Sequence, residues 1–263
     1  MTTKMSRTHL VIPDSHAHPD FNNDRFEWLG KLIVDLQPDV VVNLGDQADM
    51  ASLCSYDKGT KGFEGRRYNL DIEANKDANA RLFGVIDEYN KQQRQNKKRQ
   101  YRPETYFCMG NHEHRINRAI EEDAILDGTI SLRDLGNEDY YDVVADFLSP
   151  VVVDGVTYQH YFTSGVMNRS IAGEHPAYSC LVKKHVSCIS GHSHMRDFAE
   201  QVRGDGKRIM SLVAGVYQDY HADYAGPANE MWWSGVVILR NVEDGEFEHE
   251  WVSIKTLKEK YGS

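Results

Sequence analysis

The sequence predicts an α/β protein in which two β-sheets pack face to face and helices lie outside them. Within the first 110 residues, short β-branched and apolar runs alternate with segments of helical spacing. After residue 150 the pattern changes to a series of short strands, some joined by glycine-containing turns typical of hairpins. No linker, repeat or low-complexity tract separates the two halves. We therefore expect one domain over residues 1–263.

The chain opens with a strand, a helix and a second strand. Residues 8–12 are β-branched and apolar and stop at Pro13, which predicts a buried strand. Residues 24–36 carry apolar side chains near helical spacing, and Pro38 follows, as expected after a helix end. Residues 40–44 predict a second buried strand. Both strands lead directly into polar loops.

A long helix and a third strand complete the first half. The helix is predicted over residues 69–99 and the strand over residues 105–109. The helix ends with Lys97, Lys98 and Arg99, whose charges suit the C-terminus of a helix and a solvated face. A nucleic-acid-binding patch is the alternative interpretation of these three residues, and we favour it less.

The second half is rich in strands. Hairpin turns are predicted at residues 154–155 and 204–206. The predicted strands are 151–153, 156–161, 186–190, 196–203, 208–213, 235–240 and 247–254.

Composition and charge limit the class of protein. Charged residues are 27% and hydrophobic residues 40% of the chain, as in soluble globular proteins. No apolar run is long enough to span a bilayer and no signal peptide is evident, so we expect a cytoplasmic protein with no membrane partner. The net charge of −10 argues against a large non-specific nucleic-acid surface. It does not exclude a nucleotide or nucleic-acid substrate, because cations bound at an acidic site offset part of that charge.

Five predicted strand ends carry side chains that can bind metal ions. Because the carboxyl ends of strands meet at one edge of a sheet, we expect these side chains to converge there. Carboxylate, imidazole and amide oxygen together suit Mn, Fe, Zn or Ni. One carboxylate that bridges two cations would hold them at the spacing of two-metal hydrolases. In chain order these side chains are Asp14 and His16, Asp46 and Asp49, Asn111 and His112, His160, and His192 and His194.

These motifs resemble those of the calcineurin-like metallophosphoesterase superfamily. Its pattern is D-x-H, G-D-x-x-D/H, G-N-H-E/D, a lone H and G-H-x-H, and every part occurs here in that order between Asp14 and His194. The family's fold, a two-sheet sandwich flanked by helices, agrees with the predicted class. Compact stand-alone members, including bacterial and phage ones, are the most similar type. The resemblance implies hydrolysis of phosphate esters by metal-activated water.

The resemblance also implies a role for each motif residue. Asp14, His16 and His194 would bind a first divalent cation, and Asn111, His160 and His192 a second. Asp46 would bridge the two cations, with Mn as the first candidate metal and Fe, Zn or Ni as alternatives.

Residues beside the ligands have implied roles of their own. His112 would act as general acid towards the leaving group, and Asp49 would orient it through a hydrogen bond, although Asp49 could also be a helix cap. We expect Glu113 to be a hydrogen-bond acceptor rather than a ligand. Arg115 is a candidate for binding the phosphate group, and Tyr217 for stacking on a base, although core packing is the more ordinary role of an aromatic side chain there.

Two positions depart from the protein phosphatases of the family. Those enzymes hold phosphate with two arginines, and Met50 and Met109 occupy the matching positions here. Because a phosphomonoester dianion is held less well without them, we expect phosphodiester hydrolysis, on nucleotides or nucleic acid. A phosphomonoesterase is the alternative enzyme. A non-catalytic scaffold is less favoured, because no predicted ligand is missing. The oligomeric state is left open.

Overall fold

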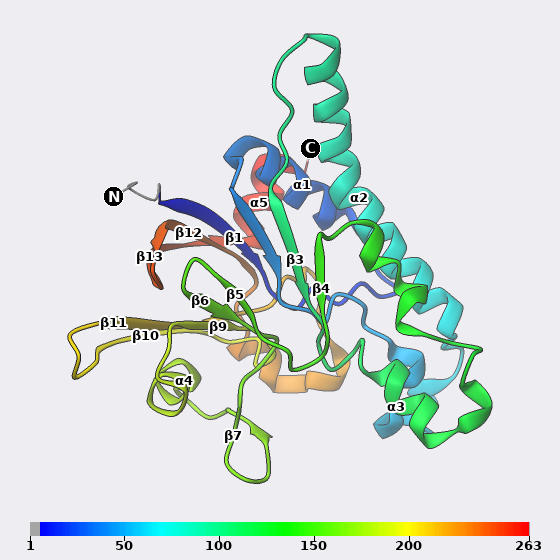
Figure 1. Ribbon diagram of the computed structural model, residues 1–263. Coiled ribbons are helices and arrows are strands. Elements are labelled where there is room, and N and C mark those ends of the chain that lie inside the picture. The colour runs from blue at the N-terminus through cyan, green and yellow to red at the C-terminus, as the bar shows by residue number, and fades with distance from the viewer. Residues whose placement is uncertain (1–5, 263) are drawn as a thin grey trace.

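The structure is a computed structural model that describes residues 6–262, leaving aside the side chains at positions 223 and 224. Two main sheets lie face to face, as predicted (Figure 1). The first sheet has the order β13-β12-β1-β2-β3-β4, and its four strands β1 to β4 are parallel. Its members are β1 (Arg7–Ile12), β2 (Val40–Asn43), β3 (Glu104–Cys108), β4 (Val143–Ala145), β12 (Gly235–Glu243) and β13 (Glu246–Ser253).

The second sheet has the order β10-β11-β9-β6-β5, in which β11, β9 and β6 are parallel. A separate two-stranded ribbon is formed by β7 (Thr163–Ser164) and β8 (Arg169–Ser170). The strands of the second sheet are β5 (Val151–Val153), β6 (Val156–Tyr158), β9 (Cys188–Ser190), β10 (Arg196–Val202) and β11 (Arg208–Ala214).

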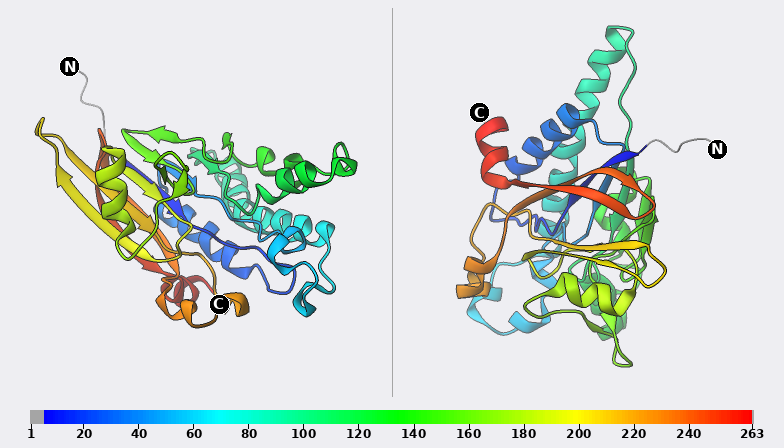
Figure 2. Two further views of the ribbon diagram at one scale, coloured as in Figure 1. Left: turned by 90° about the horizontal axis from the view of Figure 1, so that it is seen from below. Right: turned by 90° about the vertical axis from the view of Figure 1, so that its left-hand side faces the viewer.

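Helices cover the outer faces of both sheets. Figure 2 shows α1, α2 and α5 beyond the first sheet and α4 beyond the second. The α-helices are α1 (Asp24–Leu36), α2 (Tyr68–Gln95), α3 (Arg115–Glu122), α4 (Pro176–Lys184) and α5 (Ile254–Tyr261). The 3-10 helices are η1 (Ala51–Leu53), η2 (Ser55–Asp57), η3 (Lys61–Phe63), η4 (Ala124–Leu126), η5 (Leu132–Leu135), η6 (Asn137–Asp139) and η7 (Asp223–Met231).

Two apolar layers hold this arrangement together. Leu44, Ile189 and Leu239 belong to the layer between the sheets. Phe26 of α1 and Leu82 of α2 belong to the layer between the first sheet and its helices. Because strands buried on both faces are mostly apolar, residues 10–12 of β1 and 40–42 of β2 form the apolar runs from which these strands were predicted. None of the described helices is both long enough and apolar enough to cross a membrane.

Most predicted elements are confirmed, and the differences have local causes. The predicted helix over 69–99 ends at Gln95, because Lys97 adopts a left-handed backbone conformation with φ 54° and the chain turns back towards β3. The strand predicted over 156–161 ends at Tyr158, so His160 lies in the loop after β6 rather than within it. The strand predicted to reach residue 254 ends at Ser253, whose side chain accepts a hydrogen bond from the backbone N–H of Thr256 and caps α5.

Buried His9 of β1 joins the first sheet to the β5–β6 hairpin of the second sheet. The His9 ring lies 2.7 Å from the Tyr158 hydroxyl through Nδ1 and 3.1 Å from the Asp154 carboxylate through Nε2. Burial lowers the pKa of His9 below its ordinary value, although Asp154 partly opposes this and Arg7 adds to it. Folded His9 therefore stays neutral at a pH where the unfolded chain binds a proton. Its contribution to stability is present above about pH 6.5 and is lost as the pH falls from there towards the folded pKa.

We expect His9→Gln to weaken this acid sensitivity. At pH 8 the variant should be less stable by about 1–3 kcal/mol, because the buried Tyr158 hydroxyl loses its partner. Between pH 7 and pH 5 it should lose less stability than the wild type, because Gln does not titrate. Urea unfolding of both metal-free proteins at several pH values measures this. Parallel pH profiles for the two proteins would exclude His9 as the source.

Candidate metal centre

All of the predicted ligands gather at one edge of the molecule, where parallel strands end. Asp14, Asp46 and Asn111 follow the adjacent parallel strands β1, β2 and β3 of the first sheet. His160 and His192 follow β6 and β9, which are adjacent parallel strands of the second sheet. The centre therefore lies where the ends of both sheets meet, as strand topology requires.

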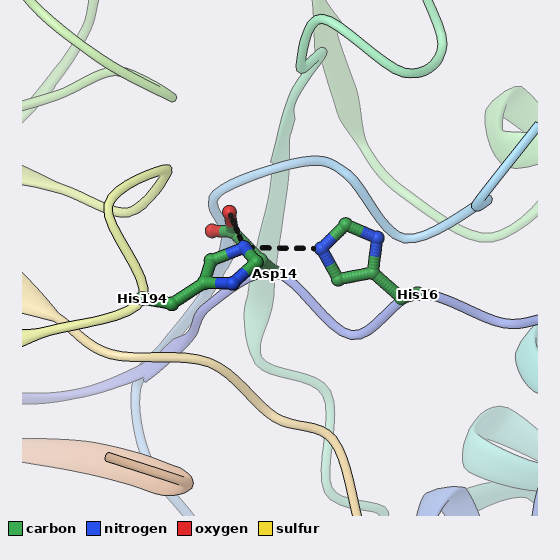
Figure 3. Close-up of side chains that lie close together, drawn as sticks. All are labelled: Asp14, His16 and His194. Carbon is green, nitrogen blue, oxygen red and sulfur yellow. Dashed lines mark hydrogen bonds and ion pairs between the residues drawn. The ribbon is translucent and has the colours of Figure 1, made fainter. Parts of the chain in front are cut away.

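The first group of ligating atoms belongs to Asp14, His16 and His194 (Figure 3). The Nε2 atom of His194 lies 3.2 Å from Oδ2 of Asp14 and 3.2 Å from Nε2 of His16. The backbone N–H of His192 donates to both Asp14 carboxylate oxygens, at 3.0 and 2.9 Å, and fixes that carboxylate. All three side chains are buried.

The second group consists of Asp46, His160 and His192, with Asn111 beside it. The Nε2 atom of His160 lies 3.3 Å from Oδ2 of Asp46 and 3.0 Å from Oδ1 of Asn111. The rings of His160 and His192 are 5.1 Å apart. Every predicted metal ligand thus lies in or beside one of the two groups.

Four of these residues have a backbone conformation that is uncommon for residues other than glycine. The φ angles are 43° for His16, 48° for Asp46, 68° for His192 and 59° for His194. Such left-handed conformations are concentrated at functional sites, where the surrounding structure maintains them.

Two glycines allow the carboxylates to lie close to the backbone. A Cβ atom at Gly110 would lie 2.1 Å from Oδ1 of Asp46, and one at Gly191 would lie 2.1 Å from Oδ1 of Asp14. No larger residue fits without moving the carboxylate. The glycines in the G-N-H-E and G-H-x-H motifs therefore make room for carboxylates of other loops.

Second partners fix the tautomers of two ligating imidazoles. His16 Nδ1 lies 3.0 Å from Oδ1 of Asp49, and His160 Nδ1 lies 2.9 Å from the carbonyl oxygen of Leu44. Both acceptors require Nδ1 to carry the proton, which leaves each Nε2 lone pair directed into the centre. There the Nε2 atoms face carboxylate oxygens and another imidazole nitrogen. A set of converging lone pairs from N and O atoms fits divalent cations.

The charges of the centre also favour a cation. Burial lowers the pKa of His160, but the Asp46 and Asp14 carboxylates raise it by more, to about 9. Burial opposes ionisation of Asp46, yet His112 and His160 hold the pKa of that carboxyl well below its usual range. Protons on imidazoles thus balance the carboxylates, and a divalent cation would replace those protons.

The loop that carries Asp46 is anchored from two sides. Buried Glu113 accepts hydrogen bonds from the backbone N–H groups of Asp46 at 2.9 Å, Ala48 at 3.0 Å and Gly110 at 2.8 Å. This confirms its expected role as a hydrogen-bond acceptor. On the other side, Gln47 donates to Asn75 and Asn79 of α2. Sequence reasoning missed this buried amide network.

His112 lies beside both groups, but Asp49 contacts it in an unexpected way. His112 Nδ1 donates to the backbone carbonyl of Asp49 at 2.7 Å, whereas the Asp49 carboxylate is closer to His16, at 3.0 Å, than to His112 Nδ1, at 3.4 Å. The expected orienting bond therefore comes from the Asp49 main chain. Arg115 donates to His112 Nε2 at 3.0 Å and to the same Asp49 carbonyl at 2.8 Å. Its role in binding phosphate stays a prediction.

The Tyr217 side chain does not line the centre, so the prediction that it contacts substrate is wrong. Its side chain is fully buried, packs edge-on against Phe26 and donates from its hydroxyl to the carbonyl of Arg25. Because the Tyr217 side chain lies in the core, it cannot stack on a bound base. Core packing, the more ordinary alternative, is what the structure shows.

Arg25 is a residue of the site that sequence reasoning missed. Its guanidinium is fully buried and donates to the carbonyl oxygens of Ser15 at 2.7 Å, His16 at 3.2 Å and Tyr217 at 3.3 Å. It also bonds the carbonyl of Asn22 at 2.8 Å. Arg25 therefore joins the loop that carries Asp14 and His16 to the segment after β11. Nothing in the amphipathic pattern of α1 distinguishes it from an exposed arginine.

Comparison with known proteins gives low similarities. No protein-family model and no curated protein matches the sequence. The chain is similar to the solved structure of TT1561 from Thermus thermophilus, with 10% identity, a TM-score of 0.41, and 95% of this chain and 99% of that one covered. It is also similar to Yfce, a phosphoesterase from E. coli, with 12% identity, a TM-score of 0.37, and 94% and 99% covered. Similarities this low leave the function to be inferred from the site itself.

Proposed function

We propose that the protein is a metal-dependent phosphoesterase of the calcineurin-like type, with two divalent cations, Mn being the first candidate. The observation that supports this most is that the ligating atoms of Asp14, His16 and His194 gather in one set and those of Asp46, His160 and His192 in another. His112 and Asp49 form a third set with His16. Asp14, His16 and His194 would hold one cation, and Asn111, His160 and His192 the other. Asp46 would lie between them. Cations bound there would activate water and offset the charge of the phosphate group.

His112 would give a proton from Nε2 to the leaving group after its imidazole has taken up a second proton. Burial lowers the pKa of His112, but the Asp46 and Asp49 carboxylates together raise it by more and so favour that uptake. The Asp49 carbonyl holds the proton of Nδ1, so Nε2 is the ring nitrogen available for transfer. In the structure Arg115 donates to that same Nε2. A substrate therefore has to displace the Arg115 guanidinium, which would free it to bind a phosphate oxygen.

His112→Ala is expected to lower turnover by about 10²–10⁴-fold while leaving metal binding unchanged, since loss of a general acid has that effect. His114→Ala is the matched control, because His114 stacks on Phe147 and belongs to neither ligand group. Turnover of bis-p-nitrophenyl phosphate and the Mn content of both variants measure this. A normal rate in His112→Ala would remove His112 from the mechanism.

Phosphodiesters are the substrates that the surroundings of the centre favour. Met50 and Met109, at the positions of the phosphatase arginines, are buried in apolar clusters. Arg66 is bound to the Ala51 carbonyl and to the Asp57 carboxylate. Neither methionine can supply a guanidinium to clamp a dianion, and Arg66 is already paired, whereas a diester carries a single negative charge.

Paired model substrates test the choice. With Mn²⁺ added, bis-p-nitrophenyl phosphate should be hydrolysed with a kcat/KM about tenfold or more above that for p-nitrophenyl phosphate. A preference for the monoester by the same factor would overturn the diester proposal but keep the phosphoesterase. Hydrolysis of neither, by protein that holds Mn²⁺, would overturn both.

A further inference from the structure

The end of α2 and the turn after it form a projecting basic segment, called here the basic tip (residues 91–102). Figure 1 shows α2 rising beyond the edge of the first sheet before the chain returns to β3, and Figure 2 shows the same from the side. The segment contains no Asp or Glu, although the chain as a whole carries a net charge of −10. Its basic residues are Lys91, Arg94, Lys97, Lys98, Arg99 and Arg102.

The cations of the basic tip are exposed and mostly unpaired. All six side chains are exposed. The nearest carboxylates along the chain, Glu88 and Glu104, pair with Lys91 at 3.1 Å and with Arg7 at 2.8 Å. Within the described part of the chain, none of the other five basic residues forms an ion pair. Most of the intervening residues carry amides, which also donate hydrogen bonds to anions.

The tip is a built structure rather than a loose charged loop. The Asn90 side chain accepts from the Tyr101 backbone N–H and donates to the Tyr101 carbonyl, both at 2.8 Å. The Tyr101 hydroxyl in turn donates to the Pro38 carbonyl at 2.8 Å. These bonds fix the returning chain against α2 and against the loop between α1 and β2. The cations are therefore presented on a rigid support, which lowers the entropy lost on binding.

The helix dipole explains only part of this charge. One or two cations in the last turn complement the C-terminus of a helix. Lys98, Arg99 and Arg102 lie beyond the end of α2 at Gln95, so the helix dipole does not account for them. Their positions suggest that they bind an external anion.

We propose that the basic tip binds the phosphate backbone of a nucleic acid without sequence preference. Exposed Lys and Arg interspersed with amide side chains suit phosphate contacts, which position a nucleic acid but do not read its sequence. The tip precedes β3 and the metal centre follows it, so the length of β3, about 16 Å, separates them. A nucleic acid bound at the tip that continues along the protein could then reach the centre. The assignment of that nucleic acid as substrate rests on the proposed phosphodiesterase function, whereas binding itself does not.

Binding is measured by the fluorescence anisotropy of a labelled DNA duplex in EDTA, without metal and without hydrolysis. The tip variant is Arg94→Glu/Lys98→Glu/Arg99→Glu. The control variant Arg169→Glu/Lys183→Glu/Lys255→Glu has the same net charge and changes exposed cations on other elements. A neutral tip variant with Gln at the three positions guards against misfolding by charge reversal, and thermal melting checks each protein.

The tip variant should bind at least about tenfold more weakly than the control at low salt, with the neutral variant between them. Its slope of log K against log salt should be shallower by about 2–3, because each lost phosphate contact removes about 0.9. All variants should hydrolyse bis-p-nitrophenyl phosphate like the wild type. Equal affinities for tip and control variants would overturn the proposal. So would a wild type that binds phosphatidylserine vesicles but not the duplex. Failure to hydrolyse diesters, with tip-dependent DNA binding intact, would instead count against the proposed function.

Discussion

Asp46→Asn is expected to lower phosphodiester hydrolysis by about 10³-fold or more, which corresponds to about 4 kcal/mol of lost transition-state stabilisation. The Asp46 carboxylate belongs to the second ligand group, and its Oδ2 lies 3.3 Å from His160 Nε2 and 3.7 Å from His112 Nε2. An asparagine can still accept the backbone N–H of His112, as Oδ1 of Asp46 does at 2.8 Å. It cannot supply the negative charge or the second oxygen. The fold should therefore survive while the centre loses the ligand that we propose to be shared by both cations.

Metal binding separates this explanation from a general loss of structure. Mn²⁺ should raise the melting temperature of the wild type, because a ligand that binds only the folded state stabilises it. It should raise that of Asp46→Asn much less. Asp77→Asn is the control, since Asp77 is an exposed carboxylate that pairs with Arg81 and belongs to neither ligand group. A normal Mn²⁺ response in Asp46→Asn would show that Asp46 is not shared between cations.

Arg25→Met is expected to have the largest effect on stability, about 3 kcal/mol or more. Removing the guanidinium leaves the buried carbonyl oxygens of Ser15 and Tyr217 without their donors, and each such loss costs about 1–3 kcal/mol. The carbonyl of His16 keeps a second donor, the Tyr220 hydroxyl at 2.7 Å. The melting temperature should fall by about 6–12 °C. Arg25→Lys should be intermediate, because a single ammonium group cannot reach all of these carbonyls at once.

Loss of the Arg25 guanidinium should also weaken one of the two proposed metal sites more than the other. Arg25 holds the loop of Asp14 and His16 but makes no hydrogen bond to the loops of Asp46 or His160. Calorimetric titration with Mn²⁺ should therefore show one site weakened and one site nearly unchanged. Arg81→Met is the matched control, because Arg81 makes only surface ion pairs and should cost about 1 kcal/mol or less. Equal weakening of both sites would reduce Arg25 to a purely structural role.

The sequence predicted the fold class and the position of the candidate site because both depend on local patterns. Continuous apolar runs mark strands buried on both faces, as in β1 and β2. Polar residues directly after such strands meet at one sheet edge by topology alone, which brought Asp14 and Asp46 together. The helix α1 was predicted with its observed bounds for the same reason, since its apolar spacing and Pro38 are local features.

The remaining features depend on contacts between segments that are distant along the chain. Arg25 bonds to the Tyr217 carbonyl, 192 positions away, and no local pattern shows this. The same holds for the burial of Tyr217 and for the carbonyl of Asp49 that orients His112. The early end of α2 depends on the backbone conformation of Lys97, a residue type that gives no turn signal. Helix α3 was missed because it is short and follows a motif that was interpreted as a loop.

A crystal of the protein soaked in Mn²⁺ and measured at the Mn absorption edge tests the metal centre most directly. The expected anomalous difference map has two neighbouring peaks. One would lie among Asp14, His16 and His194, the other among Asn111, His160 and His192, with Asp46 touching both. No peak at either position, or Mn²⁺ bound only at surface carboxylates elsewhere, would contradict the proposed centre and the chemistry assigned to it.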